Sequence, residues 1–218
     1  MIKNRTTQIV FQTVFCVLGV IGIMASLGYF EAQFKPNFYV WYTNLSNYIC
    51  IGFMFVSLAK TIKLANKKED GLITLAPTFK FLCVIMILVT CLVYNVLLAK
   101  DSVKPYFLTV SNLTLHLILP IMFVLDWVLF YPHGKTKWYY PLLSVVMPFI
   151  YVVFVLIRAA IIGSRPVSLL YPYFFLDVKT LGWAGFLGWV VALIVVFVAL
   201  GYLIYALDNI KRGRTKSK

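Results

Sequence analysis

The residues best suited to chemistry are a threonine and a histidine, each placed four residues from an amide side chain. Thr43 precedes Asn47 by four residues, and Asn112 precedes His116 by four. Residues at this spacing share one face of a helix. A threonine hydroxyl becomes a useful nucleophile when a base takes its proton, and histidine is the side chain that titrates near neutral pH. Amide groups can donate hydrogen bonds to an oxyanion. The chemistry that these residues could support is nucleophilic acyl transfer.

Each of these residues also has a structural interpretation. Thr43 or Asn44 is a residue type that caps a helix, and so is Asn112. His116 could serve only as a buried hydrogen-bonding group. Arg158 could extend its guanidinium to the lipid headgroups. Spacing alone leaves both interpretations open, because Thr43 and His116 are far apart in the sequence.

The elements that position these residues are predicted to be membrane-spanning helices. The 218 residues are 62% hydrophobic and only 12% charged, with a mean hydropathy of +0.91. A soluble domain is closer to half apolar and a quarter charged, so this composition excludes a soluble enzyme. One span takes about 20 residues. The chain is therefore predicted to be an all-α membrane protein with a single domain, residues 1–218, of six transmembrane helices at 8–30, 44–65, 77–99, 111–131, 139–163 and 182–206.

Basic residues predict the orientation of these helices. Six spans place both termini on one side, and that side carries 14 of the 20 Lys and Arg residues. Lys and Arg accumulate on the cytoplasmic side of membrane proteins. We therefore expect both termini in the cytoplasm, and the plasma membrane as the location if the protein is bacterial.

Polar residues from four of the predicted helices fall at one depth. With a rise of about 1.5 Å per residue, all of them lie within roughly 8 Å of the outer boundary. Polar groups inside a membrane are costly and suggest a functional site. Pro120 adds to this pattern, because it leaves the carbonyl of His116 without its helical partner. The residues at this depth are Thr43, Asn44, Asn47, Asn95, Asn112, His116 and Arg158.

Other charged residues have different predicted roles. Asp126 lies about 15 Å below His116 along the same helix, so a structural pair with Lys80 or Ser144 is expected. Asp101 or Asp177 is better placed to orient His116. The cytoplasmic loop that contains His133 is predicted to be solvated. Candidates for holding a substrate carboxylate are Arg158, Lys100, Lys104 and Lys179.

Small residues recur at every third position in two of the predicted spans. Such stripes let helices approach one another closely in lipid, so both are predicted to be packing faces. They are Gly19, Gly22, Ala25 and Gly28 in the first span, and Gly182, Gly185 and Gly188 in the sixth.

No cofactor is expected from the sequence. The two histidines fall on opposite sides of the membrane, and there is no HExxH motif or cysteine cluster for a metal. There is also no glycine-rich phosphate loop or dinucleotide fingerprint. The basic residues are topology signals, so nucleic acid is not an expected partner. The expected partners are membrane lipids and a lipid ester substrate, and no protein partner is identifiable.

Five short motifs carry a resemblance to a known family. They are Trp41-Tyr42-Thr43-Asn44, His116 followed by Pro120, Asp126 ten residues after His116, Tyr131-Pro132, and Tyr171-Pro172. Together they resemble the androgen-induced-gene family of six-span membrane proteins, whose animal members hydrolyse fatty acid esters of hydroxy fatty acids. Relative to those animal members, the spacing from His116 to Pro120 is one residue shorter, and Asp126 stands in place of Glu. The chain is therefore similar to a bacterial member.

The resemblance implies a function and a catalytic pair. The family's threonine in span two and histidine in span four correspond here to Thr43 and His116. The implied activity is hydrolysis of lipid esters through an acyl-threonine intermediate. The other polar residues at the same depth, Asn44, Asn47, Asn95, Asn112 and Arg158, are the expected supporting or substrate-binding residues. The alternative is a small multipass transporter or a non-enzymatic membrane scaffold. A transporter would favour broken helices around a site near the midplane.

Overall fold

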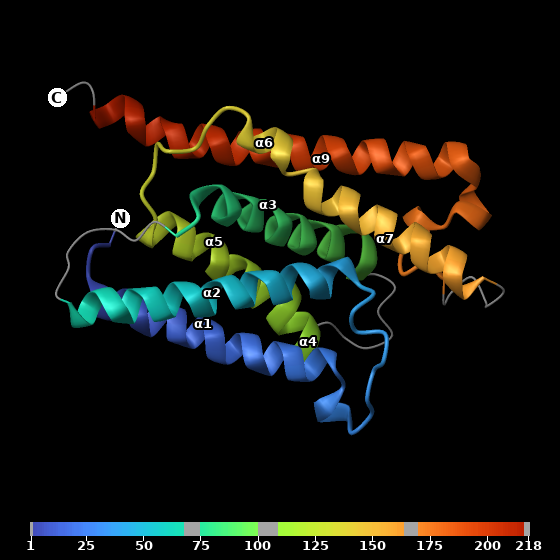
Figure 1. Cartoon of the computed structure of the whole chain (residues 1–218), viewed down its shortest axis with the longest axis horizontal. Helices are drawn as coiled ribbons and strands as arrows, with labels where there is room; N and C mark the ends of the chain where they lie inside the picture. The colour runs from blue at the N-terminus through green and yellow to red at the C-terminus, as the bar shows by residue number, and fades with distance from the viewer. Residues whose placement is uncertain (1, 68–74, 100–108, 164–169, 216–218) are drawn as a thin grey trace.

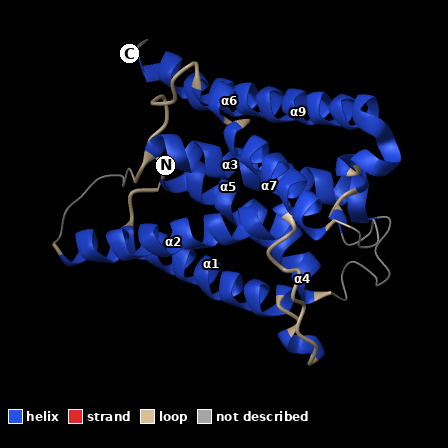
Figure 2. Ribbon diagram, turned by 45° about the vertical axis from the view of Figure 1, so that its right-hand side comes forward, coloured by secondary structure: helices blue, strands red, loops and turns tan. Residues whose placement is uncertain are grey.

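The computed structural model describes residues 2–67, 75–99, 109–163 and 170–215, with side chains up to residue 210. These residues form helices and loops and no strand (Figure 2). Six helical segments are long and apolar enough to cross a membrane, so the chain has the architecture of an integral multi-pass membrane protein. They span Arg5–Ser26, Tyr42–Asn66, Pro77–Leu98, Val110–Phe130, Tyr140–Ile162 and Val178–Ile210.

Several spans are built from more than one helical piece. The single-piece spans are α1 (Arg5–Ser26) and α2 (Tyr42–Asn66). A π-helical turn, η2 (Tyr94–Leu98), ends the span that α3 (Pro77–Val93) begins. The fourth span joins α4 (Val110–Leu113), the π-helical η5 (Thr114–Ile118) and α5 (Leu119–Phe130), and the fifth joins α6 (Tyr140–Leu143) and α7 (Val146–Ile162). Two 3₁₀ turns, η1 (Tyr29–Glu31) and η6 (Phe174–Leu176), lie in loops, and α9 (Val178–Thr215) is the last helix.

Successive spans run in opposite directions (Figure 1). The start of α1 and the last turns of α9 lie at one end of the bundle, whereas the start of α2, α4 and the start of α9 lie at the other. We call the second end the site end. The residues that the sequence places at one depth are thereby gathered at the site end.

Two local features set the limits of the first and last spans. Gly28 adopts a left-handed conformation with φ of +85°, which ends α1 earlier than the predicted residue 30 because a helix cannot continue through it. Asp177 accepts hydrogen bonds from the backbone N–H groups of Lys179 (3.0 Å) and Thr180 (3.1 Å). This N-cap starts α9 before the predicted residue 182. Gly182, with φ of +65° and ψ of 170°, then interrupts the helix.

The packing core joins α1, α2, α3 and α5, and α9 covers α3 and α6. Phe15, Met54, Cys83 and Leu119 are completely buried in this core. Gly22 permits the closest helix contact, because a Cβ there would lie 2.6 Å from Leu115 Cδ2. The predicted packing role of the first small-residue stripe is confirmed at this position.

The second small-residue stripe does not pack in the predicted way. A Cβ at Gly182 or Gly188 would meet nothing within 4 Å, and at Gly185 it would meet only Leu181 of the same helix. Close contact of α9 is made instead by Gly201, where a Cβ would lie 2.9 Å from the Pro141 backbone. The sixth span therefore uses its C-terminal half for helix packing.

A buried polar network ties four helices together below the site end. Lys80 Nζ lies 2.7 Å from Asp126 Oδ2, and Gln12 Nε2 donates to Asp126 Oδ1 at 3.0 Å. Thr61 Oγ1 donates to Gln12 Oε1 at 2.8 Å. The pairing of Asp126 with Lys80 is confirmed, whereas Ser144 donates to the Pro141 carbonyl at 2.6 Å instead.

The prediction that His133 is solvated is wrong. Its side chain is 5% exposed, and Nδ1 lies 2.9 Å from Asp208 Oδ1, while Nε2 lies 3.0 Å from the Val128 carbonyl. Asp208 also accepts the N–H groups of Gly134 and Thr136, each at 3.1 Å. The loop after α5 is therefore fastened to α9 through one buried carboxylate.

Candidate functional site

The largest cavity near the polar residues opens at the site end of the bundle. It has a volume of about 690 Å³, and we call it the outer cavity. Thr43 and His116 both line it, although they come from different helices. Its other walls mix polar and aromatic side chains: Ser26, Lys35, Asn37, Phe38, Trp41, Asn44, Tyr94, Leu98, Ser111, Pro172, Tyr173 and Phe174.

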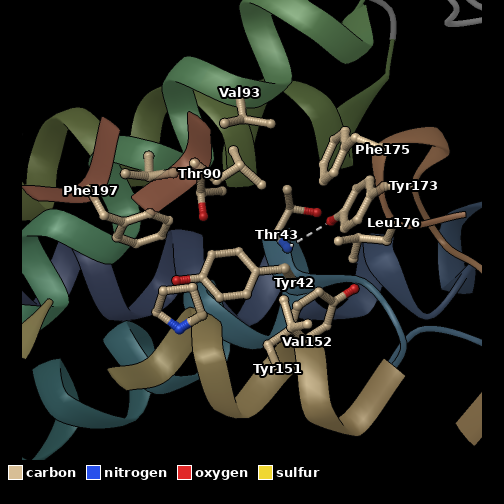
Figure 3. A pocket seen from close by; sticks show the side chains of 13 residues that line it. Tyr42, Thr43, Thr90, Val93, Tyr151, Val152, Tyr173, Phe175, Leu176 and Phe197 are labelled. Atoms are coloured by element: carbon tan, nitrogen blue, oxygen red, sulfur yellow. Dashed lines mark hydrogen bonds between the residues drawn. The ribbon is translucent and has the colours of Figure 1, made fainter. Parts of the chain in front are cut away.

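Thr43 occupies the first turn of α2, where backbone N–H groups have no partner within the helix. The Thr43 N–H is satisfied by the hydroxyl oxygen of Tyr173 at 3.2 Å. Figure 3 shows the Thr43 hydroxyl directed toward this same tyrosine. The Thr43 side chain is buried, with 6% of the residue exposed. The Tyr173 hydroxyl therefore acts as the cap at this N–H group, and the Thr43 side chain is not used as a helix cap.

The helix that carries His116 is opened by a π-helical turn and a proline. The Leu119 N–H bonds to the Thr114 carbonyl, five residues back, and Pro120 has no N–H to offer. The carbonyls of Leu115 and His116 are thereby freed from the helix ladder. Asn47 Nδ2 donates to the Leu115 carbonyl at 2.8 Å, and Asn95 Nδ2 donates to the His116 carbonyl at 3.1 Å.

The two asparagines therefore hold the broken helix in place from its neighbours. Asn47 Nδ2 also donates to the Thr43 carbonyl at 2.7 Å, so a single nitrogen atom joins the Thr43 turn of α2 to the His116 segment. Both of its partners are acceptors, which fixes the orientation of this amide. Asn95 likewise caps the Cys91 carbonyl at 2.7 Å. Asn47 and Asn95 thus position the site by hydrogen bonds to backbone.

The His116 ring is held by stacking rather than by hydrogen bonds. It lies 3.6 Å from the Tyr94 ring centroid at an interplanar angle of 12°. The residue is 6% exposed, and neither ring nitrogen has a hydrogen-bond partner among the described residues. The backbone of Asn112, one turn earlier, lies close to the ring. A buried polar group without a partner is unfavourable, so these nitrogens are suited to a group that enters the cavity.

Of the remaining predicted site residues, some line the outer cavity and others lie away from it. Asn44 lines the outer cavity and donates to the Phe38 carbonyl at 3.0 Å. Asn112 lies on α4 and is not part of the outer cavity wall. Arg158 lies elsewhere, where Nη1 donates to the Leu170 carbonyl at 3.0 Å, and lines a separate cavity with Tyr39 and Phe154.

The charged residues predicted to assist the site also lie elsewhere. Asp177 caps α9 and Lys179 Nζ donates to the Gly163 carbonyl at 3.4 Å, so Asp177 is engaged away from His116. Asp101, Lys100 and Lys104 lie outside the described residues. Lys35 is the described cation in the outer cavity wall, and it pairs with Glu31 at 2.9 Å. Lys35 lies in the loop after the first span, and no sequence pattern indicated that it would line the cavity.

Tyr173 is another residue of the site that the sequence did not indicate. It is buried, and burial raises the pKa of its hydroxyl to about 12, so the hydroxyl stays protonated at neutral pH. It follows the Tyr171-Pro172 motif directly. Several aromatic residues follow one another in this segment, and only the structure shows that Tyr173 is the one that contacts Thr43.

A second, smaller cavity lies behind Thr43 (Figure 3). It has a volume of about 50 Å³, and we call it the inner cavity. Thr43 and Tyr173 line both cavities, whereas His116 lines only the outer one. The inner walls are mostly apolar and come from α2, α3, α7, η6 and α9: Tyr42, Val89, Thr90, Val93, Pro148, Tyr151, Val152, Phe175, Leu176, Leu193 and Phe197.

Comparison of the chain with protein-family models, curated proteins and solved structures gives no match. Any assignment of activity therefore depends on the site itself. Around one cavity the site combines a hydroxyl, a protonated phenol and an imidazole whose two nitrogens have no hydrogen-bond partner in the described part of the chain. These are the three kinds of group that acyl transfer needs: a nucleophile, a base and an oxyanion donor.

Proposed function

We propose that this protein is a membrane-embedded hydrolase that cleaves lipid esters through an acyl-threonine intermediate. The observation that carries the proposal is that Thr43 and His116 line one cavity while both nitrogens of the His116 ring lack a partner among the described residues. The resemblance to the androgen-induced-gene family supports the same pair. It also supports a bacterial membrane as the location.

The proposed reaction has two steps. His116 takes the proton from the Thr43 hydroxyl, and the Thr43 oxygen forms a bond to the ester carbonyl carbon. The bond from that carbon to the alcohol oxygen then breaks, and His116 returns the proton to the departing alcohol. In the second step His116 takes a proton from water, and the water oxygen forms a bond to the acyl carbon. The bond from that carbon to the Thr43 oxygen then breaks, and His116 returns the proton to the Thr43 oxygen, which releases the carboxylic acid. No metal or cofactor is required.

Two groups are placed to stabilise the oxyanion in both steps. The protonated hydroxyl of Tyr173 lies beside Thr43. The N-terminal end of α2 contributes the positive end of its dipole. We therefore assign Tyr173 as an oxyanion donor.

Replacing Tyr173 with phenylalanine is the test of this assignment. Because phenylalanine keeps the ring that stacks on Phe175 at 4.9 Å, the fold should be retained. We expect kcat to fall by about 10²–10³-fold, the effect of losing one oxyanion donor, with little change in KM. An unchanged kcat in the folded variant would limit Tyr173 to capping α2.

The nucleophile is tested by two substitutions at Thr43, measured with a panel of lipid esters. Thr43→Ala should abolish turnover, because no oxygen remains to be acylated. Thr43→Ser should keep partial activity, because the hydroxyl survives but the rotamer is less restricted. Thr43→Val is the matched control for shape, and it should be as inactive as Thr43→Ala. Substantial turnover by the folded alanine variant would rule out covalent catalysis.

The shape of the interior supports an enzyme over a transporter. The outer cavity lies at one end of the bundle, and beneath it Phe15, Leu119 and Phe123 are completely buried. Below these residues the Lys80–Asp126 pair and Gln12 fill the space between the helices. A transporter needs access from both faces at a central site, which the described residues do not provide.

The proposed orientation places both termini in the cytoplasm and the outer cavity toward the outside. Single cysteines introduced at Asn37 and Thr180 should then react with an impermeant thiol reagent on intact cells, whereas cysteines at Lys67 and Lys137 should react only after permeabilisation. Three native cysteines, Cys16, Cys50 and Cys83, are buried, whereas Cys91 is half-buried, so labelling of the protein without an introduced cysteine gives the background. The opposite labelling pattern would place the cavity on the cytoplasmic side.

A further inference from the structure

The two cavities meet at Thr43 and differ in size and polarity. The outer cavity, about 690 Å³, has Lys35, Asn44 and Ser111 in its wall. The inner cavity, about 50 Å³, is lined mainly by aliphatic and aromatic carbon. Two of its polar wall groups are engaged, since Thr90 Oγ1 lies 2.6 Å from Ser46 Oγ and Tyr151 donates to the Val40 carbonyl at 2.8 Å. The Tyr42 hydroxyl, which is also in the wall, is buried without a hydrogen-bond partner among the described residues. Because most of the wall is carbon, the inner cavity suits a small group that is mainly apolar.

The position of His116 decides which part of an ester each cavity receives. An ester whose carbonyl carbon lies at Thr43 has an acyl arm and an alcohol arm that point away from each other. His116 must reach the departing alcohol oxygen to protonate it, and His116 lines only the outer cavity. The alcohol arm therefore lies in the outer cavity, which leaves the inner cavity for the acyl arm.

The size of the inner cavity limits the length of that arm. An apolar cavity of about 150 Å³ in another protein holds benzene, which has six carbon atoms. By the same proportion, the inner cavity of about 50 Å³ holds about two carbon atoms, in addition to the carbonyl carbon that lies at Thr43. Buried walls such as Phe197, which is 3% exposed, close it toward the bundle core.

We propose that the preferred substrates are esters of short-chain acids, with acyl groups of about two to four carbon atoms, on a larger amphiphilic alcohol. This inference rests on the proposed Thr43 hydrolase. In the reaction, the Thr43 oxygen bonds to the short acyl carbon and the alcohol leaves with the proton from His116. Water then releases a short carboxylic acid and restores the Thr43 hydroxyl.

Chain-length profiles of p-nitrophenyl esters test this inference, because the alcohol arm stays constant while the acyl arm grows from two to twelve carbon atoms. For the wild-type protein in detergent micelles, we expect kcat/KM to be highest at two to four carbon atoms. By eight carbon atoms it should have fallen by at least about 10-fold, since a poorly fitted methylene group is worth a factor of 10 or more.

Two variants alter the size of the inner cavity in opposite directions. Leu193→Ala enlarges it and should move the optimum to longer acyl groups, whereas Val152→Phe fills it and should favour the two-carbon ester. Leu187→Ala is the matched control on the same helix, because Leu187 is 53% exposed and outside the cavity wall. It should leave the profile unchanged. Thermal unfolding identifies any variant that does not fold, and either cavity variant alone is informative.

The outcomes separate this inference from the proposed function. Turnover that Thr43→Ala abolishes but that is highest at eight or more carbon atoms overturns the assignment of the acyl arm and leaves the hydrolase intact. A profile that the folded cavity variants do not change has the same consequence. Turnover that persists in Thr43→Ala, or no turnover of any ester, overturns the hydrolase and this inference with it.

Discussion

Replacing His116 with alanine is expected to lower kcat for ester hydrolysis by about 10²–10⁴-fold, the usual contribution of a general base. No other described histidine, carboxylate or amine faces Thr43 across the outer cavity except Lys35, which is paired with Glu31. Both acylation and deacylation use the same imidazole, so both steps should slow. The effect should be measured as kcat at a saturating ester concentration. The melting temperature of the variant in detergent shows whether the variant is folded.

The second histidine provides the matched control. His133 is buried against Asp208 and the Val128 carbonyl, away from the outer cavity. His133→Ala should therefore lower the melting temperature while kcat per folded molecule stays close to wild type. The reverse result, with activity sensitive to His133 and indifferent to His116, would contradict the assignment of the base.

The losses of catalytic rate caused by Thr43→Ala and His116→Ala should not be additive. If His116 acts only by activating Thr43 and its acyl ester, the double alanine variant should be about as inactive as either single variant, as found for groups that act as a unit. A double variant that is slower by the product of the two single effects would mean that the residues act independently.

The largest expected effect on stability comes from breaking the buried Lys80–Asp126 pair. Lys80 is 1% exposed and Asp126 is 4% exposed. In Lys80→Met, the Asp126 carboxylate keeps only the Gln12 hydrogen bond. Removing one partner of a buried ion pair costs about 3–5 kcal/mol, because the other charge remains in an apolar environment. The free energy of unfolding, measured by chemical denaturation in mixed micelles, should fall by this amount.

A second substitution separates charge from packing. Lys80→Met combined with Asp126→Leu removes both charges and should recover most of the lost stability, since apolar replacement of a buried pair is often neutral. Asp126→Asn alone should destabilise the protein more than it lowers the rate per folded molecule, because Asp126 lies far from Thr43 along the bundle. A well-folded Asp126→Asn variant without hydrolysis would show that this network takes part in the reaction.

The sequence was sufficient to predict the six spans and that most of the polar site residues gather at one end of the bundle. Long apolar runs leave no other architecture, and a fixed rise per residue converts position into depth. The helix break at Pro120 was also predictable, because proline lacks an N–H. It could not be predicted that Asn47 and Asn95 would satisfy the freed carbonyls, since this depends on how three helices are rotated about their axes.

Residues in the connecting segments were the hardest to predict. His133 lies in a loop with Lys135 and Lys137, so its composition indicated solvent, but Asp208 on a distant helix draws it inside. Tyr173 and Lys35 also lie in connections between spans, and periodicity gives no information about such segments. Arg158 lines a different cavity, because a position along a helix does not specify the direction around the helix axis.

Thr43 is proposed to be the nucleophile whose hydroxyl oxygen becomes acylated. An alkyl fluorophosphonate tests this role most directly, because the adduct that the probe forms with a nucleophile is not hydrolysed. The account predicts that the probe inhibits hydrolysis and that mass spectrometry finds the phosphonyl group on Thr43. Labelling should be absent in Thr43→Ala and much slower in His116→Ala. Inhibition with an unmodified Thr43, or a phosphonyl group on another residue such as Ser46 or Ser111, would contradict the account.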